Sequence, residues 1–130
     1  MLELRPHIGT VAAFTQHVNE LQRPEGYRLV ALFTEADTYA VAVAGFRLTH
    51  HFHWGRAIYC DDLSTRAEYR GHGHAGSLLD WMIGEAGRLQ CDEFHLDSGL
   101  APDRQPAHRL YFRTGMRIAS FHFTMTLPQD

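Results

Sequence analysis

The feature that most limits how this chain folds is a glycine-rich turn, YRGHGHAG at residues 69–76, between a β-rich segment and an amphipathic helix. Residues 75–90 are predicted to form that helix. Apolar side chains at helical spacing give it a buried face made of Leu78, Leu79, Met82, Ile83, Ala86 and Leu89. A glycine-rich turn at a helix N-terminus presents backbone N–H groups, and such junctions bind phosphate or pyrophosphate. The alternatives are a flexible turn and, through the histidines, a metal site.

One helix and three strands are predicted before this turn. Residues 10–22 carry apolar side chains at helical spacing. Residues 27–33 and 38–48 are β-branched and apolar on either side of polar residues 34–37, which predicts a hairpin. Residues 56–65 form a third strand, which closes an antiparallel meander.

Three further elements are predicted after the helix. Residues 93–98 read as a short strand, and residues 107–114 as a helix that Gly115 ends. Residues 117–127 alternate between apolar and polar side chains, which predicts a last strand. The order of helix, meander, helix, strand, helix and strand indicates the α+β class with a mixed sheet, in a single domain over residues 1–130.

Composition excludes several kinds of partner. The chain has 130 residues, 45% of them hydrophobic, which suits one domain with its own core. A formal net charge of −3 argues against a duplex nucleic-acid partner, which favours a basic surface. No apolar run is long enough to span a membrane, and the start has no signal-peptide pattern. The two cysteines fit neither a disulfide framework nor a CxxC site. We therefore expect a cytoplasmic protein with no nucleic-acid or membrane partner.

The glycine-rich turn itself favours an anion over a metal. Arg70, Gly73 and Ala75 fit the pattern R-x-x-G-x-A, in which small residues let the backbone approach an anion and the arginine adds a charged contact. The turn is not a Walker loop, because the GK[S/T] ending is absent. His72 and His74 are two residues apart, which is a poor helical spacing for metal ligands. We predict no metal site.

Two motifs in this order resemble the signature of the GNAT superfamily of N-acetyltransferases. In that signature a strand is followed by Q/R-x-x-G-x-G/A and a helix, as in the turn described above. A later helix carries A-x-x-x-Y-x-x-x-G-F, which here is Ala107, Tyr111 and Gly115, with Met116 where the family usually has phenylalanine. The resemblance covers roughly residues 27–127. It implies a GNAT-like mixed sheet with flanking helices.

Four stretches are similar to a narrower branch, the one that contains aminoalkylphosphonate N-acetyltransferases. They are RLTHHFHWG, DSG, AHRLYFRTGM and SFHFTMTL.

The chain departs from the family pattern at its start. GNAT domains open with a strand and a full first helix, whereas this chain begins at a point that corresponds to the inside of that helix. We therefore expect the N-terminal strand and part of the first helix to be missing. A missing edge strand leaves unpaired backbone groups that another chain can cover, which predicts a homodimer.

The resemblance implies transfer of an acetyl group from acetyl-CoA to the primary amine of a small molecule, by direct attack in a ternary complex. The pantetheine arm would pair with Leu63, Ser64 and Thr65, and an N–H near Leu63 or Ser64 would polarise the thioester carbonyl. Arg104 matches a position that often contacts CoA, with a plain surface arginine as the alternative. The CoA pyrophosphate would contact Arg70, Gly71, His72, Gly73, His74, Ala75 and Gly76.

Three residues are candidates for proton transfer. An amine substrate arrives protonated, so a general base must take its proton, and Asp61 and Asp62 are the candidates. Strand alternation places the two on opposite faces, so that one of them can point at the substrate, and the choice stays open. Tyr111 matches the family tyrosine that protonates the leaving thiolate, with a core aromatic as the alternative.

The acceptor side is less defined. His50, His51, His53 and Trp54 lie in a turn beside the expected acceptor cleft and either bind an anionic acceptor or form a plain polar turn. Asp97 and Ser98 end a strand near the same place. Two other functions remain as alternatives: a non-catalytic CoA-binding or regulatory module, and a histidine-based metal-binding protein.

Overall fold

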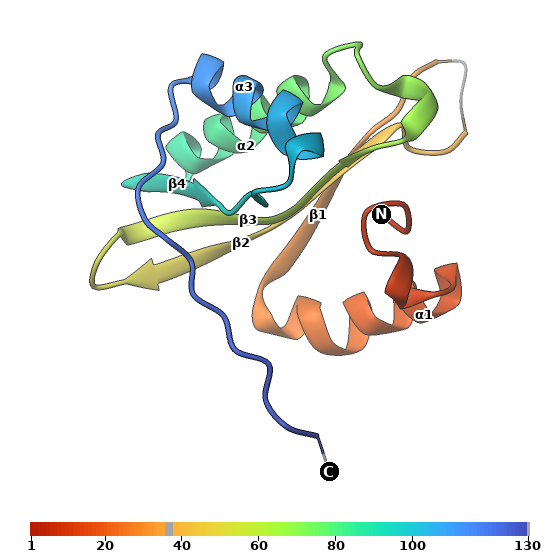
Figure 1. The fold of residues 1–130 in the computed structure, drawn as a ribbon, viewed down its shortest axis with the longest axis horizontal. Coiled ribbons are helices and arrows are strands. Elements are labelled where there is room, and N and C mark those ends of the chain that lie inside the picture. Colours follow the sequence, from red (N-terminus) through yellow and green to blue (C-terminus); the bar gives the residue numbers. More distant parts are fainter. Residues whose placement is uncertain (36–37, 130) are drawn as a thin grey trace. The chain divides into compact units, whose positions relative to one another are not determined.

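The computed structural model describes residues 1–35 and 38–129 (Figure 1). Its contacts divide the chain into two compact units, Met1–Leu96 and Asp97–Asp130, which are described in turn. The single domain expected over the whole chain stays a prediction. Part of the expected polar connection at residues 34–37 lies outside the described residues. None of the described helices is long and apolar enough to cross a membrane.

The first unit is built on a four-stranded mixed sheet, which confirms the predicted fold class. The strands are β1 (Tyr27–Leu32), β2 (Ala42–His51), β3 (Gly55–Thr65) and β4 (Glu93–Leu96), in the order β1-β2-β3-β4. The first two pairings are antiparallel and the third is parallel. β2 begins at Ala42 rather than at the predicted residue 38, because the regular ladder with β1 starts at that residue.

One face of this sheet is covered by α2 (His74–Arg88), which Figure 1 shows running across the strands. The contact is apolar, and the Phe46 ring of β2 meets the Trp81 ring edge-on at a centroid distance of 6.0 Å. Most of the predicted face of α2 is buried, including Leu79 and Met82. Among the residues that the structure describes, the largest fully buried side chains are Phe46, Ile58, Leu79, Met82 and Val41.

The predicted face of α2 is wrong at one position. Ile83 is 37% exposed, and Glu85 is buried in its place. The Glu85 carboxylate accepts hydrogen bonds from Arg88 and lies 3.5 Å from the Arg28 guanidinium of β1. The bonds from Arg88, aided by Arg28, hold the pKa of Glu85 below its usual range. Hydrophobic periodicity cannot detect a carboxylate that is buried because two arginines neutralise it.

The N-terminal helical region is three short pieces rather than the single predicted helix. In α1 (Val11–His17) the Thr10 hydroxyl caps the first turn by accepting a hydrogen bond from the Ala13 N–H at 3.0 Å. The backbone then continues through a π turn, Val18–Gln22, and a 3₁₀ turn, Arg23–Glu25. Gly26, in the left-handed region at φ 93°, ends the helical path.

The second unit contains one helix. α3 (Gln105–Thr114) follows a 3₁₀ turn, Pro102–Arg104, and begins two residues before the predicted start. Gly115 adopts φ 97° and ends it, as predicted. The strand predicted at residues 117–127 is wrong for this structure, because none of the described residues 116–129 pairs in a ladder. Alternation of apolar and polar side chains gives a strand one apolar face. A strand also needs a neighbouring strand to pair with its backbone N–H and C=O groups.

A β-bulge interrupts the pairing of β2 with β3. Gly45 lies opposite Asp62 and Phe46 opposite Cys60, so Asp61 has no partner residue in β2. An extra residue of this kind bends the strand and shifts the alternation of its side chains.

Tyr27 crosses the sheet toward this bulge on the face opposite α2. Its hydroxyl donates a 2.7 Å hydrogen bond to Oδ2 of Asp62, although the two residues lie on β1 and β3. β2 lies between them, and Gly45 makes the crossing feasible. A Cβ atom at Gly45 would lie 1.6 Å from the Tyr27 oxygen. The missing side chain of Gly45 is therefore the space that Tyr27 fills.

We expect Gly45→Ala to lower the free energy of unfolding by about 1–3 kcal/mol, because the new methyl group collides with a tyrosine that is 3% exposed. Gly84→Ala is the matched control. It lies within α2, and its Cβ would meet nothing within 4 Å. Removing that helical glycine should stabilise the protein by about 0.5–1 kcal/mol. Urea denaturation measures both, and equal effects of the two variants would contradict the role of Gly45.

Two buried groups near the bulge should make stability fall at alkaline pH. Burial raises the pKa of the Cys60 thiol to about 12. Burial, and then the hydrogen bond to Asp62, raise the pKa of Tyr27. In the unfolded chain the pKa of a cysteine thiol is about 8.5 and that of a tyrosine hydroxyl is about 10. Above about pH 8.5 the unfolded state therefore loses protons that the native state keeps, and the free energy of unfolding falls by up to about 1.4 kcal/mol per pH unit for each group.

Denaturation curves between pH 7 and 11 measure this decline. Cys60→Ala should remove the part that begins first, near pH 8.5, and leave the part due to Tyr27. A wild-type stability that stays constant up to pH 11 would show that neither proton is retained in the native state.

Candidate functional site

The two candidate base residues lie on one face of the sheet, not on opposite faces as predicted. The Asp61 carboxylate accepts hydrogen bonds from Nε and Nη2 of Arg47, at 3.2 and 2.6 Å. Asp62 accepts from Tyr27, and Tyr27 and Arg47 are directly opposite each other in β1 and β2. Cross-strand partners share a face, so both carboxylates reach the same side. The bulge at Asp61 is the physical reason, because it breaks the simple alternation of β3.

This face is opposite the one covered by α2. Arg28 and Phe46 are cross-strand partners, and both contact α2 through Glu85 and Trp81. The neighbouring residues in each strand, Tyr27 and Arg47, therefore point the other way.

An arginine from the N-terminal segment joins the carboxylates. Nε of Arg5 donates to Oδ1 of Asp62 at 2.9 Å, and Nη2 donates to the backbone oxygen of Asp61 at 3.2 Å. Glu3 of the same segment accepts a 3.0 Å hydrogen bond from the N–H of Ala67, just beyond the end of β3. The N-terminal segment is thus attached to β3 at the bulge and again after its last residue.

The two carboxylates differ in their surroundings. Both oxygens of Asp62 accept hydrogen bonds, from Arg5 and Tyr27, and its side chain is 12% exposed. The Asp61 side chain is 22% exposed, and its charged partner among residues 1–35 and 38–129 is Arg47. The sequence reasoning missed Arg5, Tyr27 and Arg47. No local pattern marks them, because their placement depends on strand register and on the bulge.

The stretch of β3 expected to pair with pantetheine has an open edge. β4 pairs with β3 at Ala57–Cys60, and within the part of the chain that the structure describes no strand pairs with residues 61–65 on the side away from β2. Leu63, Ser64 and Thr65 lie in this stretch and are half-buried. The pairing of the parallel strands therefore ends at Cys60, and among the described residues the next part of β3 has no strand partner on that side.

The glycine-rich turn leads from that edge to the N-terminus of α2. Gly71 and Gly73 both adopt φ 81°, the left-handed region that favours glycine. A Cβ at either position would meet nothing within 4 Å, so the backbone conformation and not crowding inside the chain requires glycine there. Nε of Arg70 lies 3.4 Å from the Thr65 oxygen, which connects the turn to the end of β3.

The N-terminus of α2 has no side-chain cap. Gly73 is the N-cap residue and has no side chain to accept a hydrogen bond, and the Ser77 N–H bonds to the Gly73 oxygen at 3.0 Å. The N–H groups of His74, Ala75 and Gly76 precede that first helical bond. Such N–H groups and the helix dipole together attract an anion. The His72 and His74 rings are 6.1 Å apart, and the described residues contain no group of three potential metal ligands.

The expected acceptor turn packs on its own neighbours. Trp54 stacks on His95 of β4 at a centroid distance of 3.6 Å, and the His51 ring is 4.6 Å from Trp54. His50 shares a 3.1 Å hydrogen bond with Arg56, while His53 is exposed. The aromatic contacts of this turn have a structural explanation without a ligand.

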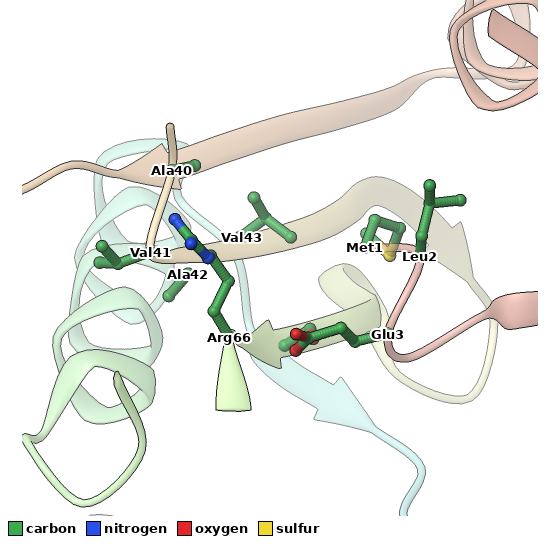
Figure 2. A pocket seen from close by; sticks show the side chains of 9 residues that line it. Met1, Leu2, Glu3, Ala40, Val41, Ala42, Val43 and Arg66 are labelled. Atoms are coloured by element: carbon green, nitrogen blue, oxygen red, sulfur yellow. The ribbon is translucent and has the colours of Figure 1, made fainter. Parts of the chain in front are cut away.

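A pocket of about 210 Å³ lies beside the N-terminal segment (Figure 2). Glu3 and Arg66 border the pocket, and Figure 2 shows both side chains near the C-terminal end of β3. Its lining is completed by Met1, Leu2, Ala40, Val41, Ala42, Val43 and Ser64. The pocket therefore borders Ser64 of the expected pantetheine stretch but not Asp61 or Asp62.

The second unit holds the remaining candidates. Tyr111 is half-buried on α3, one turn after Ala107, and Arg104 is half-buried in the preceding 3₁₀ turn. His108 is half-buried as well. Its Nε2 lies 2.9 Å from both the Ser98 hydroxyl and the Gly99 oxygen, which ties α3 to the loop before it.

Comparisons with solved structures agree on the fold. A probable acetyltransferase is 15% identical, with a TM-score of 0.75, and the match covers 99% of this chain and 87% of that one. An aminoglycoside acetyltransferase from an uncultured soil metagenomic sample is 18% identical, with a TM-score of 0.72 and coverage of 92% and 76%. Glucosamine-6-phosphate N-acetyltransferase from Arabidopsis thaliana is 15% identical, with a TM-score of 0.72 and coverage of 92% and 82%.

Sequence comparison identifies the family. No curated protein matches this chain. The model of the acetyltransferase (GNAT) family matches residues 3–116, which include β1 to β4, the glycine-rich turn and α3. The chain therefore belongs to the GNAT family of acetyltransferases.

Proposed function

We propose that this protein transfers the acetyl group of acetyl-CoA to the primary amine of a small molecule, by direct attack in a ternary complex. The observation that carries the proposal is the unpaired edge at residues 61–65 of β3, followed along the chain, after one short turn, by the uncapped N-terminus of α2. An extended arm with amide groups suits the edge, and a pyrophosphate suits the helix N-terminus. Acetyl-CoA carries both groups in one molecule.

The cofactor contacts follow from this surface. Leu63, Ser64 and Thr65 would pair with the pantetheine arm, and an N–H of this stretch would stabilise the oxyanion as the amine attacks. Arg104 of the second unit is proposed as a further contact, on the basis of its position before the family helix. The pyrophosphate would be held by Arg70, Gly71, His72, Gly73, His74, Ala75 and Gly76.

We assign the general base to Asp61 and a structural role to Asp62. Asp62 is held at both oxygens by different elements and is the less exposed of the two. Asp61 is the more exposed, lies at the bulge beside the open edge, and keeps free lone pairs on oxygens that bond only to Arg47 among the described residues. It would take the proton of the incoming ammonium group directly or through one water.

Tyr111 is proposed to protonate the leaving thiolate. The support is its place in the family motif, with Ala107 and Gly115 at the matching positions and Gly115 ending α3. A phenol with a pKa near about 10 is a suitable acid for a thiolate leaving group.

The acceptor is proposed to be a small primary amine. The similarity to the branch that contains aminoalkylphosphonate N-acetyltransferases narrows this proposal to an aminoalkylphosphonate. The matched structures named above include an aminoglycoside acetyltransferase and a glucosamine-6-phosphate N-acetyltransferase, and the fold alone does not select among such acceptors.

A CoA-binding or regulatory module without activity is the second candidate. The ion pairs favour it, because Asp61 and Asp62 each accept hydrogen bonds from arginine at short distance. A base that stays paired during the reaction would be unable to accept a proton.

A panel of amines, amino acids and aminophosphonates with acetyl-CoA tests the proposal, with thiol release as the readout. We expect Asp61→Asn to lower kcat/KM by about 10²- to 10⁴-fold, as for loss of a general base. The amide also loses one of the two hydrogen bonds from Arg47, but this pair is partly exposed, so the free energy of unfolding should fall by no more than about 1 kcal/mol. Asp62→Asn is the matched variant on the next residue. It should lower the free energy of unfolding by about 1–3 kcal/mol. The amide NH₂ that replaces one carboxylate oxygen cannot accept the hydrogen bond that this oxygen accepted from Arg5 or Tyr27.

Two results would decide against parts of this assignment. Acetyl-CoA that binds without thiol release for any amine would establish the non-catalytic module. Full activity of Asp61→Asn, with activity lost in a stable Asp62→Asn, would move the base to Asp62.

The pyrophosphate site can be tested separately from catalysis with Ala75→Glu. A carboxylate in the first turn of α2 should stabilise the helix but repel the phosphates, so CoA affinity should fall by at least about tenfold while the melting temperature holds or rises. Ala75→Gln is the matched control, with the same size and no charge, and should bind CoA more tightly than Ala75→Glu. Equal calorimetric affinities of the two variants would place the phosphates elsewhere.

A further inference from the structure

Arg47 of β2 has hydrogen-bond donors that no residue among 1–35 and 38–129 accepts. Its Nε and Nη2 donate to the two oxygens of Asp61, at 3.2 and 2.6 Å. A guanidinium has further N–H groups. Oε2 of Glu25 lies 4.0 Å from Nη1 of Arg47, which is longer than a hydrogen bond. The Arg47 side chain is 25% exposed, so its remaining donors are open to a small anion.

The position of the Arg47 guanidinium does not depend on Asp61 alone. Its central carbon lies over the Tyr27 ring, 5.7 Å from the centroid, which is a cation–π distance. Tyr27 is buried and is itself held by its hydrogen bond to Asp62. The guanidinium would therefore keep its place if the Asp61 carboxylate turned away from it.

The Asp61 side chain can turn without movement of the strand. The backbone oxygen of Asp61 accepts a 3.2 Å hydrogen bond from Nη2 of Arg5, and the bulge leaves Asp61 without a partner residue in β2. Release from Arg47 thus needs a change of side-chain rotamer and not a displacement of β3. The pair of Asp61 and Arg47 is partly exposed on both sides, and such pairs are weak enough for another anion to compete.

We propose that Arg47 binds an anionic group of the acceptor, and that this exchange releases Asp61 to act as the base. The acceptor would be a small amine that also carries a phosphonate or a carboxylate, because a guanidinium binds both groups through two parallel hydrogen bonds. The inference rests on the proposed acetyl transfer to an amine, and it adds the residue that selects the acceptor.

The exchange removes the conflict between the ion pair and a catalytic role for Asp61. While both oxygens bond to Arg47, the carboxylate faces the guanidinium and not the incoming ammonium group. Once released, Asp61 takes one proton from the ammonium nitrogen, and the neutral amine forms the C–N bond as the C–S bond breaks. The nitrogen loses two protons in all. Asp61 passes the first to water, and the second balances the one that the thiolate gains.

Two pairs of acceptors test whether the charge of the acceptor matters. β-Alanine and β-alaninamide have nearly the same size and differ by one negative charge, and 2-aminoethylphosphonate is compared with propylamine. We expect the wild-type kcat/KM, measured as thiol release, to be at least about 100-fold higher for the anionic member of one or both pairs. Equal values within both pairs would overturn the inference and leave the proposed acetyl transfer in place.

Arg47→Gln should remove this preference. The preferred anionic acceptor should lose at least about 100-fold in kcat/KM. Its neutral counterpart should react as fast as before or faster, because Asp61 is no longer paired. Arg47→Lys keeps the charge without the planar fork and should keep part of the preference. An equal loss for both members of a pair would show that Arg47 is only structural.

Arg28→Gln is the matched control for this change. Arg28 lies on β1, and its partner Glu85 belongs to α2 on the other face of the sheet. Its loss should leave the preference for an anionic acceptor unchanged. A preference that disappears equally in Arg28→Gln and Arg47→Gln would contradict a specific role for Arg47.

Calorimetric binding of methylphosphonate separates this inference from the proposed function. Methylphosphonate has no amine, so it reports the anion contact without turnover. It should bind the wild type and Arg28→Gln, and Arg47→Gln at least about tenfold more weakly. If no amine releases thiol, the proposed function fails, while this difference in binding still supports the anion contact. Far-UV circular dichroism checks the fold, and Arg47→Lys replaces Arg47→Gln if the latter is unfolded. No binding by the wild type, or equal binding by the Arg47 variant, would overturn the inference.

Discussion

The bulge at Asp61 is the constraint on which the candidate site depends. One extra residue in β3 is enough to bring two neighbouring carboxylates onto the same face, where Arg47 and Tyr27 meet them. The same strand separates from β4 after Cys60 and so keeps its last residues open on one side. A regular β3 would send one carboxylate toward α2 and into an apolar core, where an unpaired charge is costly. The irregularity thus determines the polar cluster, and the open edge of β3 begins at the same residue.

Around the bulge, the sheet is tied together by contacts that cross it. Tyr27 spans β2 through the space left by Gly45, and Arg5 attaches the N-terminal segment to Asp62. These contacts join residues that are 35 and 57 positions apart in the chain. They hold the end of β3 in place from the face that α2 does not cover. A site whose residues lie on strands and are held by such contacts is more rigid than one built on loops.

Much of the fold was predictable because local signals agreed with it. Leu79 and Met82 lie on the apolar face of α2, Gly115 ends α3, and the three-strand meander follows from β-branched segments. The errors arise where distant residues decide. Glu85 is buried because Arg28 and Arg88 neutralise it, and no periodicity shows that. Asp61 and Asp62 share a face because of a register shift, which a single strand's sequence does not reveal. Residues 117–127 have a strand pattern, but pairing depends on a partner.

The uncapped start of α2 has a consequence for the stability of the whole chain. Gly73 offers no side chain to the first N–H groups of this helix, and Gly71 and Gly73 give the turn before it many conformations in the unfolded state. An anion bound at these N–H groups, as we propose for the pyrophosphate, would take the place of the missing cap. Such a ligand would act on the native state alone, so the unfolding equilibrium would shift with its concentration. In a cell, the stability of this protein would then follow the supply of the proposed ligand.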